Sequence, residues 1–185
     1  TLTNLTVSGN TATSGRGLFI VISNPTLTNS IVWGNEATSE GSEISFNGGE
    51  LQDSFSIVKQ SEGAIGGDDL LGEHTNLDPL FVGADDYTLQ EGSPAKDTGN
   101  SDALLLSTAL ANALNSSKTL CESRGGSWNA DATPKCTLDV NNQTNCQAAK
   151  GEWQANKCWI TTTDLNGNSR ISGSSVDMGA YEIQQ

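Results

Sequence analysis

The 185-residue sequence has few basic residues, few aromatic residues and no long apolar run. Its 9 Lys and Arg residues stand against 22 Asp and Glu residues, which gives a formal net charge of −13. Nucleic acids and anionic membranes attract clustered positive charge, so this composition argues against both classes of partner. The longest purely apolar run, residues 18–22, is far too short to span a bilayer.

The sequence opens without a signal peptide, because no basic segment followed by an apolar stretch stands at its start. Aromatic residues make up only 5% of the chain, whereas Gly, Asn, Ser and Thr are frequent throughout. Such a composition favours many short strands joined by turns over a helical bundle. The length fits one domain, or one domain with a small insertion.

A repeat of 25 residues occupies the first part of the chain. The aligned identities include Leu2/Leu27, Asn4/Asn29, Val7/Val32, Gly9/Gly34, Asn10/Asn35, Ala12/Ala37 and Ser14/Ser39. A third copy begins one residue early, with Leu51 in the place of Leu27. A period of this length with short strand-like segments is typical of a solenoid, whose repeats bury a core only by stacking. We therefore predict an all-β fold, a right-handed parallel β-helix with Leu2, Leu27 and Leu51 stacked inward.

Asn4, Asn29 and Asp53 would then form one column at a turn. Their side chains either hydrogen-bond along the stack, as in an asparagine ladder, or serve simply as good turn residues. The sequence leaves both readings open. Because the sequence starts inside a repeat, we expect the first coil to be covered by upstream coils of a longer precursor or by self-association, and subunits stacked head to tail would form a filament.

After Gln60 the repeat ends, and a capping region follows at residues 61–100 and 161–185. Its apolar residues could cover the open end of the coils; they are Leu80, Phe81, Tyr87, Leu89, Met178 and Tyr181. Its charged residues include Asp97, Arg170 and Asp177, with Glu182 close by in sequence. An Arg–carboxylate pair would pin distant parts of this cap together, whereas the alternative is a set of solvated charges.

Four short elements of this region occur in a characteristic order. They read DPLF at residues 78–81, LQ-x-GSPA-x-D-x-G at 89–99, D-x-x-G-x-x-R at 164–170 and D-x-GAYE at 177–182. The set resembles the C-terminal segment of choice-of-anchor Q domain proteins, and the resemblance covers about residues 1–100 and 161–183. It implies a bacterial surface or secreted protein built on a pectate-lyase-like parallel β-helix, with coils at residues 1–60.

Residues 101–160 interrupt the resemblance and form a cysteine-rich inserted module. Ser101 and Asp102 could cap a helix over residues 103–114. A unit of Cys, six residues, Trp, a short loop and Lys-Cys then occurs twice and contains Cys121, Cys136, Cys146 and Cys158. Four cysteines allow three pairings, and the repeat favours Cys121–Cys136 with Cys146–Cys158. Zinc is the rival reading, but no Cys-x-x-Cys spacing supports it.

The tryptophans of this module, Trp128, Trp153 and Trp159, could stack on sugars or form a small core, and a core is the commoner use. Asp164, Asn166 and Asn168 alternate around Gly167 like part of a calcium loop, although Ser175 stands where a terminal Glu would be. Calcium is the one cofactor that the sequence suggests, and none is required by the fold.

The coils offer no convincing catalytic constellation. Glu36, Glu40 and Glu43 fall near a turn, where we expect them to be solvated, and His74 is expected to lie exposed in a loop. The sequence therefore predicts an extracellular structural or adhesive protein of the bacterial cell surface. The alternative is a polysaccharide-binding or polysaccharide-degrading protein, a lyase or hydrolase, whose catalytic coils lie outside this chain.

Overall fold

The computed structural model describes the chain in several stretches and is mostly β-strand with few helices. The described residues are 1–13, 17–38, 43–60, 65–66, 70–105, 117–123, 125–133, 135–137, 140, 142–148, 151–154, 157–159, 163–170 and 172–184. They belong to two compact units, unit 1 with Thr1–Asn100 and Asp164–Gln185, and unit 2 with Ser101–Thr163. None of the helices in the described part is long and apolar enough to cross a bilayer.

Unit 1 begins with short parallel strands that pair across one repeat length. β1 (Leu2–Thr3) pairs with β5 (Thr26–Thr28), β2 (Thr6–Ser8) with β6 (Ile31–Trp33), and β3 (Thr11–Ala12) with β7 (Glu36–Ala37). Leu2 lies opposite Leu27, and side-chain hydrogen bonds join the two repeats at a separation of 25 residues. The predicted parallel pairing at this spacing is confirmed.

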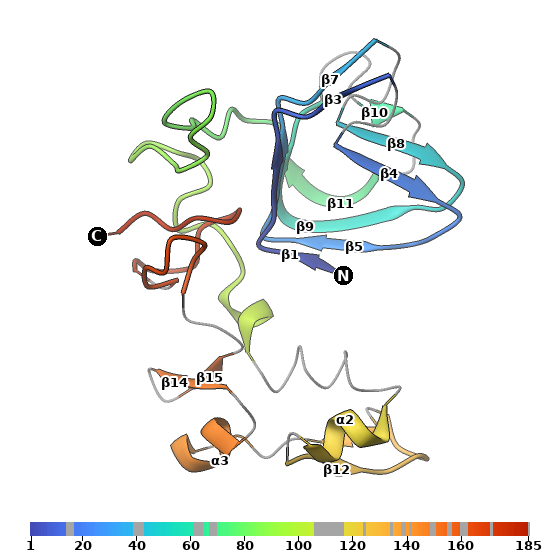
Figure 1. The fold of residues 1–185 in the computed structure, drawn as a ribbon, viewed down its shortest axis with the longest axis vertical. Helices are drawn as coiled ribbons and strands as arrows, with labels where there is room; N and C mark the ends of the chain where they lie inside the picture. The colour runs from blue at the N-terminus through green and yellow to red at the C-terminus, as the bar shows by residue number, and fades with distance from the viewer. Residues whose placement is uncertain are drawn as a thin grey trace. The chain divides into compact units, whose positions relative to one another are not determined.

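Two further sets of strands continue the stack. β4 (Leu18–Val21), β8 (Ile44–Asn47) and β10 (Ile65–Gly66) form a three-stranded parallel sheet. The long β9 (Leu51–Val58) pairs first with β5 and then with β6, and β11 (Leu70–Thr75) runs along its other edge. Figure 1 shows β1, β5 and β9 side by side, with β4 and β8 on another side of the stack.

The strands bend at one stacked turn position, which curls the largest sheet. Asn4, Asn29 and Phe55 occupy it, with φ of 54°, 51° and 51°. A left-handed backbone turns the chain sharply, and Asn adopts it more readily than most residues. Phe55 therefore continues the Asn column, and the expectation that Asp53 does so is wrong.

The register changes after the second repeat because one extra residue lies between β7 and β8. Leu18 lies opposite Ile44 and Leu27 opposite Asp53, so the separation is 26 residues. Leu51 is fully buried in the same interior cluster as Leu27 but pairs with Leu70. Leu51 was predicted to continue the column of Leu2 and Leu27, and in the structure Asp53 takes that place.

Polar side chains also bridge the repeats inside the stack. Asn10 donates to Asn35 Oδ1 over 2.9 Å, so an asparagine ladder exists at this column. At the predicted column, Asn29 instead bonds the backbone of Asn100, and Oδ1 of Asn4 has no hydrogen-bond partner in the described part of the chain. The ladder reading of Asn4 and Asn29 is therefore wrong, and the Asn10–Asn35 contact was not predicted.

Glu43 is fully buried, contrary to the expectation that it is solvated. Its carboxylate accepts hydrogen bonds from the backbone N–H groups of Gly34 and Asn35 and from the Asn35 amide, at 2.8, 3.1 and 2.6 Å. These donors replace the water that a buried carboxylate loses. Glu36 is exposed as expected, and Glu40 lies outside the described residues.

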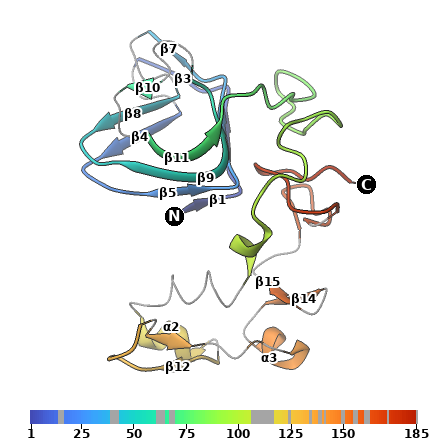
Figure 2. The same cartoon turned by 180° about the vertical axis from the view of Figure 1, so that it is seen from behind.

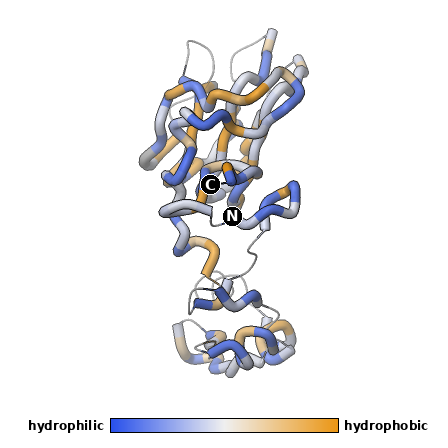
Figure 3. The backbone as a smooth tube through the Cα atoms, turned by 90° about the vertical axis from the view of Figure 1, so that its left-hand side faces the viewer, coloured by the Kyte–Doolittle hydropathy of each residue, from blue (hydrophilic) through white to orange (hydrophobic). Residues whose placement is uncertain are grey.

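The interior of unit 1 is apolar and is built by the alternating residues of the strands. Its fully buried members are Leu27, Val32, Ile44, Leu51 and Val58. In Figure 3 the tube of unit 1 carries both hydrophobic and hydrophilic stretches. Within β9, buried Leu51 and Asp53 alternate with exposed Gln52 and half-buried Ser54, the pattern expected of a strand with one buried face.

Of the predicted capping residues, Leu89 and Met178 are buried against β6 and β9 and Phe81 packs at the edge of their cluster, whereas Leu80 is 37% exposed. Ile31 and Ile57 form a second cluster with Leu89 and Met178, while their neighbours Val32 and Val58 point inward. Backbone hydrogen bonds of 2.7 Å from Gly179 to Asn29 and of 3.0 Å from Met178 to Ala95 hold the C-terminal segment in place. This segment, residues 164–170 and 172–184, is called the tail below.

Unit 2 contains a helix and a hairpin twice. α2 (Lys118–Ser123) is followed by the hairpin β12 (Ser127–Trp128) and β13 (Cys136–Thr137), and α3 (Gln143–Ala148) by β14 (Glu152–Gln154) and β15 (Lys157–Trp159). Figure 2 shows each helix beside its own hairpin. A 3-10 helix, η1 (Ser101–Leu104), stands where the predicted helix begins, and most of that helix, residues 106–116, lies outside the described residues.

Candidate functional site

Asp53 and His74 form the first candidate site, where β9 and β11 run side by side. Gly72 of β11 lies opposite Asp53, and His74 lies opposite Ser56. The register shifts between Glu73 and His74. A shift of this kind re-aims the side chain that follows it, and here it brings the imidazole toward Asp53.

The two side chains are joined in a partly buried chain of polar contacts. His74 Nδ1 lies 3.0 Å from Oδ1 of Asp53, and the Asp53 side chain is fully buried. The side-chain amide of Gln60 contacts His74 Nε2. Gln60 is itself anchored to Asn76 by hydrogen bonds of 2.9 and 3.3 Å. A polar path therefore leads from the exposed Gln60 to a carboxylate inside the stack.

Gly72 makes room for this arrangement. Its φ is +115°, and a Cβ atom there would lie 2.0 Å from the backbone oxygen of Asp53 and 2.7 Å from its Oδ1. Any larger residue would therefore push against the carboxylate that holds His74.

Burial raises the pKa of Asp53 above its ordinary value, against the opposing effects of the hydrogen bond and charge of His74. Oδ2 of Asp53 has no hydrogen-bond partner in the described part of the chain, which is costly for a buried group. Nδ1 of His74 faces Asp53, and Nε2 contacts the side-chain amide of Gln60. The carboxylate and the amide together fix the orientation of the imidazole ring.

The prediction that His74 is exposed in a loop is wrong, because it is a half-buried residue of β11. The expected alignment placed Leu51 in the interior column and left Asp53 at a turn. The missed signal is the alternation Leu70, Gly72, His74, which continues the inward positions of a strand.

A second candidate site is a buried cluster of charges in the capping region. Arg170, Asp177 and Glu182 are 2%, 1% and 7% exposed. Asp177 accepts the backbone N–H groups of Asp97 and Ile183 at 2.6 and 2.7 Å, and its own N–H donates to Glu182 at 2.9 Å. Charged residues are almost never so deeply buried without partners. The reading of these residues as solvated charges is therefore wrong.

The cluster holds two buried carboxyl groups and one guanidinium, but no ion pair within 4.0 Å joins Arg170 to either carboxyl group in the described part of the chain. Burial raises the pKa of Glu182 to about 8, and the nearby charge of Asp177 adds to this rise. Burial likewise raises the pKa of Asp177. Burial lowers the pKa of Arg170, whereas the charges of Glu182, Asp164 and Asp177 counteract that effect. Arg170 donates through Nη2 to the backbone oxygen of Gly179.

The predicted cap residues are thus brought together. Asp97 contributes its N–H to Asp177 and accepts the N–H of Ser175 at 3.2 Å. The contact of Asp97 with the 175–177 segment joins two parts of the sequence that the inserted module separates. Sequence reasoning chose the right residues but did not show that the backbone supplies most of their hydrogen bonds.

The predicted calcium loop is a turn closed by hydrogen bonds. Oδ1 of Asp164 accepts the N–H of Asn168 at 2.8 Å, and Oδ2 accepts the N–H of Glu182 at 3.1 Å. This geometry favours a turn-closing role for Asp164 over a metal-binding role. Asn166 and Asn168 are exposed. The described residues hold no group of three His, Cys, Asp or Glu side chains that could bind a metal ion.

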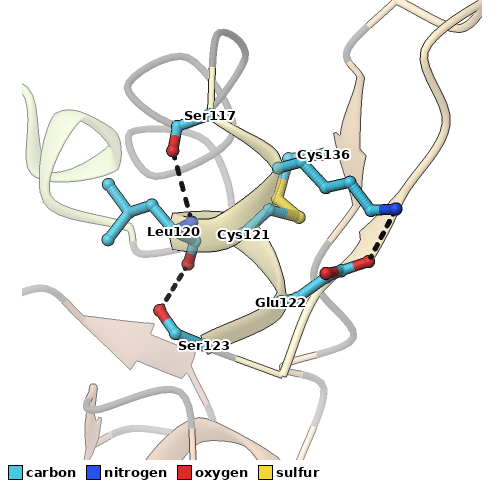
Figure 4. The surroundings of a disulfide bond; sticks show 7 residues. Ser117, Leu120, Cys121, Glu122, Ser123 and Cys136 are labelled. Carbon is cyan, nitrogen blue, oxygen red and sulfur yellow. Dashed lines mark hydrogen bonds and ion pairs between the residues drawn. A yellow bond between two sulfur atoms is a disulfide. The ribbon is translucent and has the colours of Figure 1, made fainter.

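The predicted disulfide pairing is confirmed. Cys121 is bonded to Cys136 and Cys146 to Cys158, one bond for each helix and hairpin. Figure 4 shows the first bond joining α2 to the hairpin strand, with Ser117 and Ser123 hydrogen-bonded to Leu120 at either side. Disulfides of this kind are typical of oxidising compartments.

The tryptophans serve the small core of unit 2. Trp128 and Trp153 pack against the four half-cystines and Val140. Trp159 is 3% exposed and donates its indole N–H to the backbone oxygen of Gln154 at 2.9 Å. The interpretation of Trp159 as a core residue is therefore confirmed, and a stacking role for it would require the core to open.

Comparison with known proteins gives no relative: no family model matches the sequence, and neither a curated protein nor a solved structure matches it.

Proposed function

We propose that unit 1 is the end of a right-handed parallel β-helix in an extracellular structural or adhesive protein of a bacterial cell surface. The carrying observation is the register of the strands, in which β1/β5, β2/β6 and β3/β7 all pair in parallel one repeat apart. Connections between parallel strands are right-handed in nearly all known cases, which supports the hand. Stacked coils of this kind make rigid, extended bodies.

The capping region supports the choice-of-anchor Q resemblance. The GSPA-x-D-x-G and D-x-GAYE elements meet at Asp97 and Asp177, and the second element contacts the coils through Gly179. Contact between the two elements supports a shared structural role for them, which a chance similarity in sequence order would not require. The two disulfides support an extracellular location, because thiols in the cytosol are kept reduced.

Self-association, or stacking on upstream coils, is the proposed assembly. Among the described residues, β4 pairs with β8 on one side and with no strand on the other. Its residues Phe19 and Val21 are 58% and 44% exposed. An unprotected edge with apolar residues pairs readily with another strand.

Sedimentation velocity over a range of concentrations tests this assembly. We expect the average mass of the wild-type chain to rise with concentration, and Val21→Lys to suppress the rise because a charge on an edge strand blocks pairing. Asn47→Lys is the matched control, since Asn47 lies opposite Val21 on β8, which is paired on both sides. A chain that stays monomeric at all concentrations, or equal effects of the two variants, would contradict the proposal.

The Asp53–His74 pair favours one alternative function, the binding or cleavage of polysaccharide. A histidine oriented by a carboxylate is suited to general base catalysis, provided that a substrate displaces the Gln60 amide from Nε2. Incubation with acidic and neutral polysaccharides, followed by measurement of new reducing ends, separates the two functions. Shortening by the wild type that disappears in His74→Gln would favour the enzyme, whereas unchanged chains in both would favour the structural role.

A further inference from the structure

We propose that the tail, residues 164–170 and 172–184, is a proton-operated strap whose docking on the coils depends on the buried pair Asp177 and Glu182. The proposal goes beyond the structural or adhesive function and does not depend on it. It rests on the geometry of the charge cluster and on how that cluster is connected to the coils.

The backbone of Gly179 and Ala180 links the cluster to the coils. The backbone oxygen of Gly179 accepts the guanidinium of Arg170, and the N–H of the same residue donates to the backbone oxygen of Asn29 at 2.7 Å. Ala180 donates to Oγ1 of Thr6 at 3.0 Å. Gly179 has a φ of +95°, and a Cβ atom there would lie 2.8 Å from Thr6 Oγ1. The backbone of the tail at Gly179 therefore lies so close to the coils that no side chain fits between them.

The strap covers apolar surface on the coils. Met178 packs with Ile31 and Ile57 on the outer face of β6 and β9, and Ile183 lies at the edge of the same cluster. Release of the tail would expose this strip to water, which costs free energy in proportion to its area. Docking is thus a balance between apolar burial, which favours it, and burial of charge, which opposes it.

The charges around the Asp177–Glu182 pair come from two segments. Arg170, in the turn at the start of the tail, acts on both carboxylates, whereas Asp97 and Lys96, in the segment before unit 2, act on Asp177. Deprotonated Asp177 and Glu182 place two negative charges in a buried cluster with one guanidinium. In the described part of the chain this guanidinium forms no ion pair with either carboxylate within 4.0 Å, and its Nε has no hydrogen-bond partner. Protonation of Glu182 relieves this imbalance.

The direction of the pH dependence follows. Burial raises the pKa of Glu182 from 4.5 to about 8, so the docked tail retains a proton that the released tail loses between these two values. A group that binds more protons in the docked state stabilises docking at low pH. Docking is therefore tightest below about pH 4.5 and weakens as the pH rises through about 8.

Amide hydrogen exchange of the whole chain tests the strap. We expect the protection factors of Met178 and Gly179, which are corrected for the intrinsic effect of pH, to fall by at least about tenfold across this range, the factor that one pKa unit of interaction gives. Ile57, whose N–H bonds the backbone oxygen of Ser30 inside the coils, should keep its protection. Glu182→Gln mimics the protonated side chain and should abolish the fall.

Glu36→Gln, at an exposed residue of β7, is the matched control and should leave the fall unchanged. If Glu182→Gln releases the tail at every pH, Asp177→Asn replaces it, because removal of the neighbouring charge should lower the pKa of Glu182 and move the fall to lower pH. Protection that is constant with pH in the wild type would overturn the proposal, as would a fall that persists unchanged in both variants.

Discussion

At the scale of single residues, unit 1 is distinguished by buried polar side chains that take the place of apolar ones. Glu43 is buried with three hydrogen-bond donors, whereas Asp53 is buried with one partner, His74. The position of Asp53 opposite Leu27 is one that a leucine would fill. The Asp53–His74 pair therefore stands where an apolar side chain would add to the core.

Replacement of His74 alone should lower the stability of unit 1, whereas replacement of Asp53 and His74 together should largely preserve it. We expect His74→Leu to lower the free energy of unfolding of unit 1 by about 1–3 kcal/mol, because it leaves Asp53 buried without a partner. The double variant Asp53→Leu with His74→Leu should recover most of that loss, since apolar groups can replace a buried polar pair. Urea denaturation measures both changes. Equal destabilisation by the single and double variants would show that the pair is not coupled.

At the scale of elements, the repeat predicted the strands well and their third register poorly. The aligned identities between the first two repeats were enough to place β1/β5 and β2/β6 in register. The third repeat shares only scattered residues with the first two. The predicted alignment placed Leu51 opposite Leu27, whereas Asp53, two residues later, pairs with Leu27. A single residue added between β7 and β8 changes the register from 25 to 26 residues, and the conformational preferences of the residues in the sequence do not reveal this change.

The candidate sites were predictable to different degrees for the same reason. The disulfides of unit 2 depend on contacts within one short repeat unit, and the sequence predicted both. The Asp53–His74 pair depends on the register of β9 with β11, which the sequence did not reveal. The cap cluster was predictable to an intermediate degree. Its charged residues stand out in the sequence, but their burial depends on contacts between two segments of unit 1 that are far apart in the sequence.

Each disulfide of unit 2 joins a helix to its own hairpin, so its loss should act mainly on that element. Replacement of Cys121 and Cys136 together by Ser removes a bond that closes a loop of 15 residues and should destabilise unit 2 by about 3 kcal/mol. Exchange rates of the amides of α2 should rise more than those of α3. Lys118→Gln is the control, because its exposed ion pair with Glu122 contributes little. An equal rise in both helices would mean that the two halves fold as one.

At the scale of the whole molecule, the chain is made of two units that depend on different forces. Unit 1 buries the apolar columns of its strands, whereas the core of unit 2 consists largely of half-cystines with Val140, Trp128 and Trp153. Small cores of this kind rarely suffice without covalent bonds. The two units should therefore respond differently to a reducing agent.

Reduction of the whole chain should unfold unit 2 and leave unit 1 folded. Thermal unfolding measured without reductant should show a transition for each unit. With reductant, the unit 2 transition should disappear and that of unit 1 should remain, because all four cysteines lie in unit 2. The quadruple Cys→Ser variant should reproduce the reduced profile without reductant. Loss of both transitions on reduction would show that unit 1 requires a folded unit 2.

The register of the strands also determines which insertions and deletions are compatible with the fold. Excision of one whole period, such as residues 5–29, would bring Asn4 next to Ser30 and leave each column of side chains continuous. A cut one residue shorter would turn a strand over and exchange its inner and outer faces. The single additional residue before β8 sits between strands, where it disturbs neither face. Genes for such a chain can therefore grow or shrink in steps of one coil, with odd-sized changes confined to the turns.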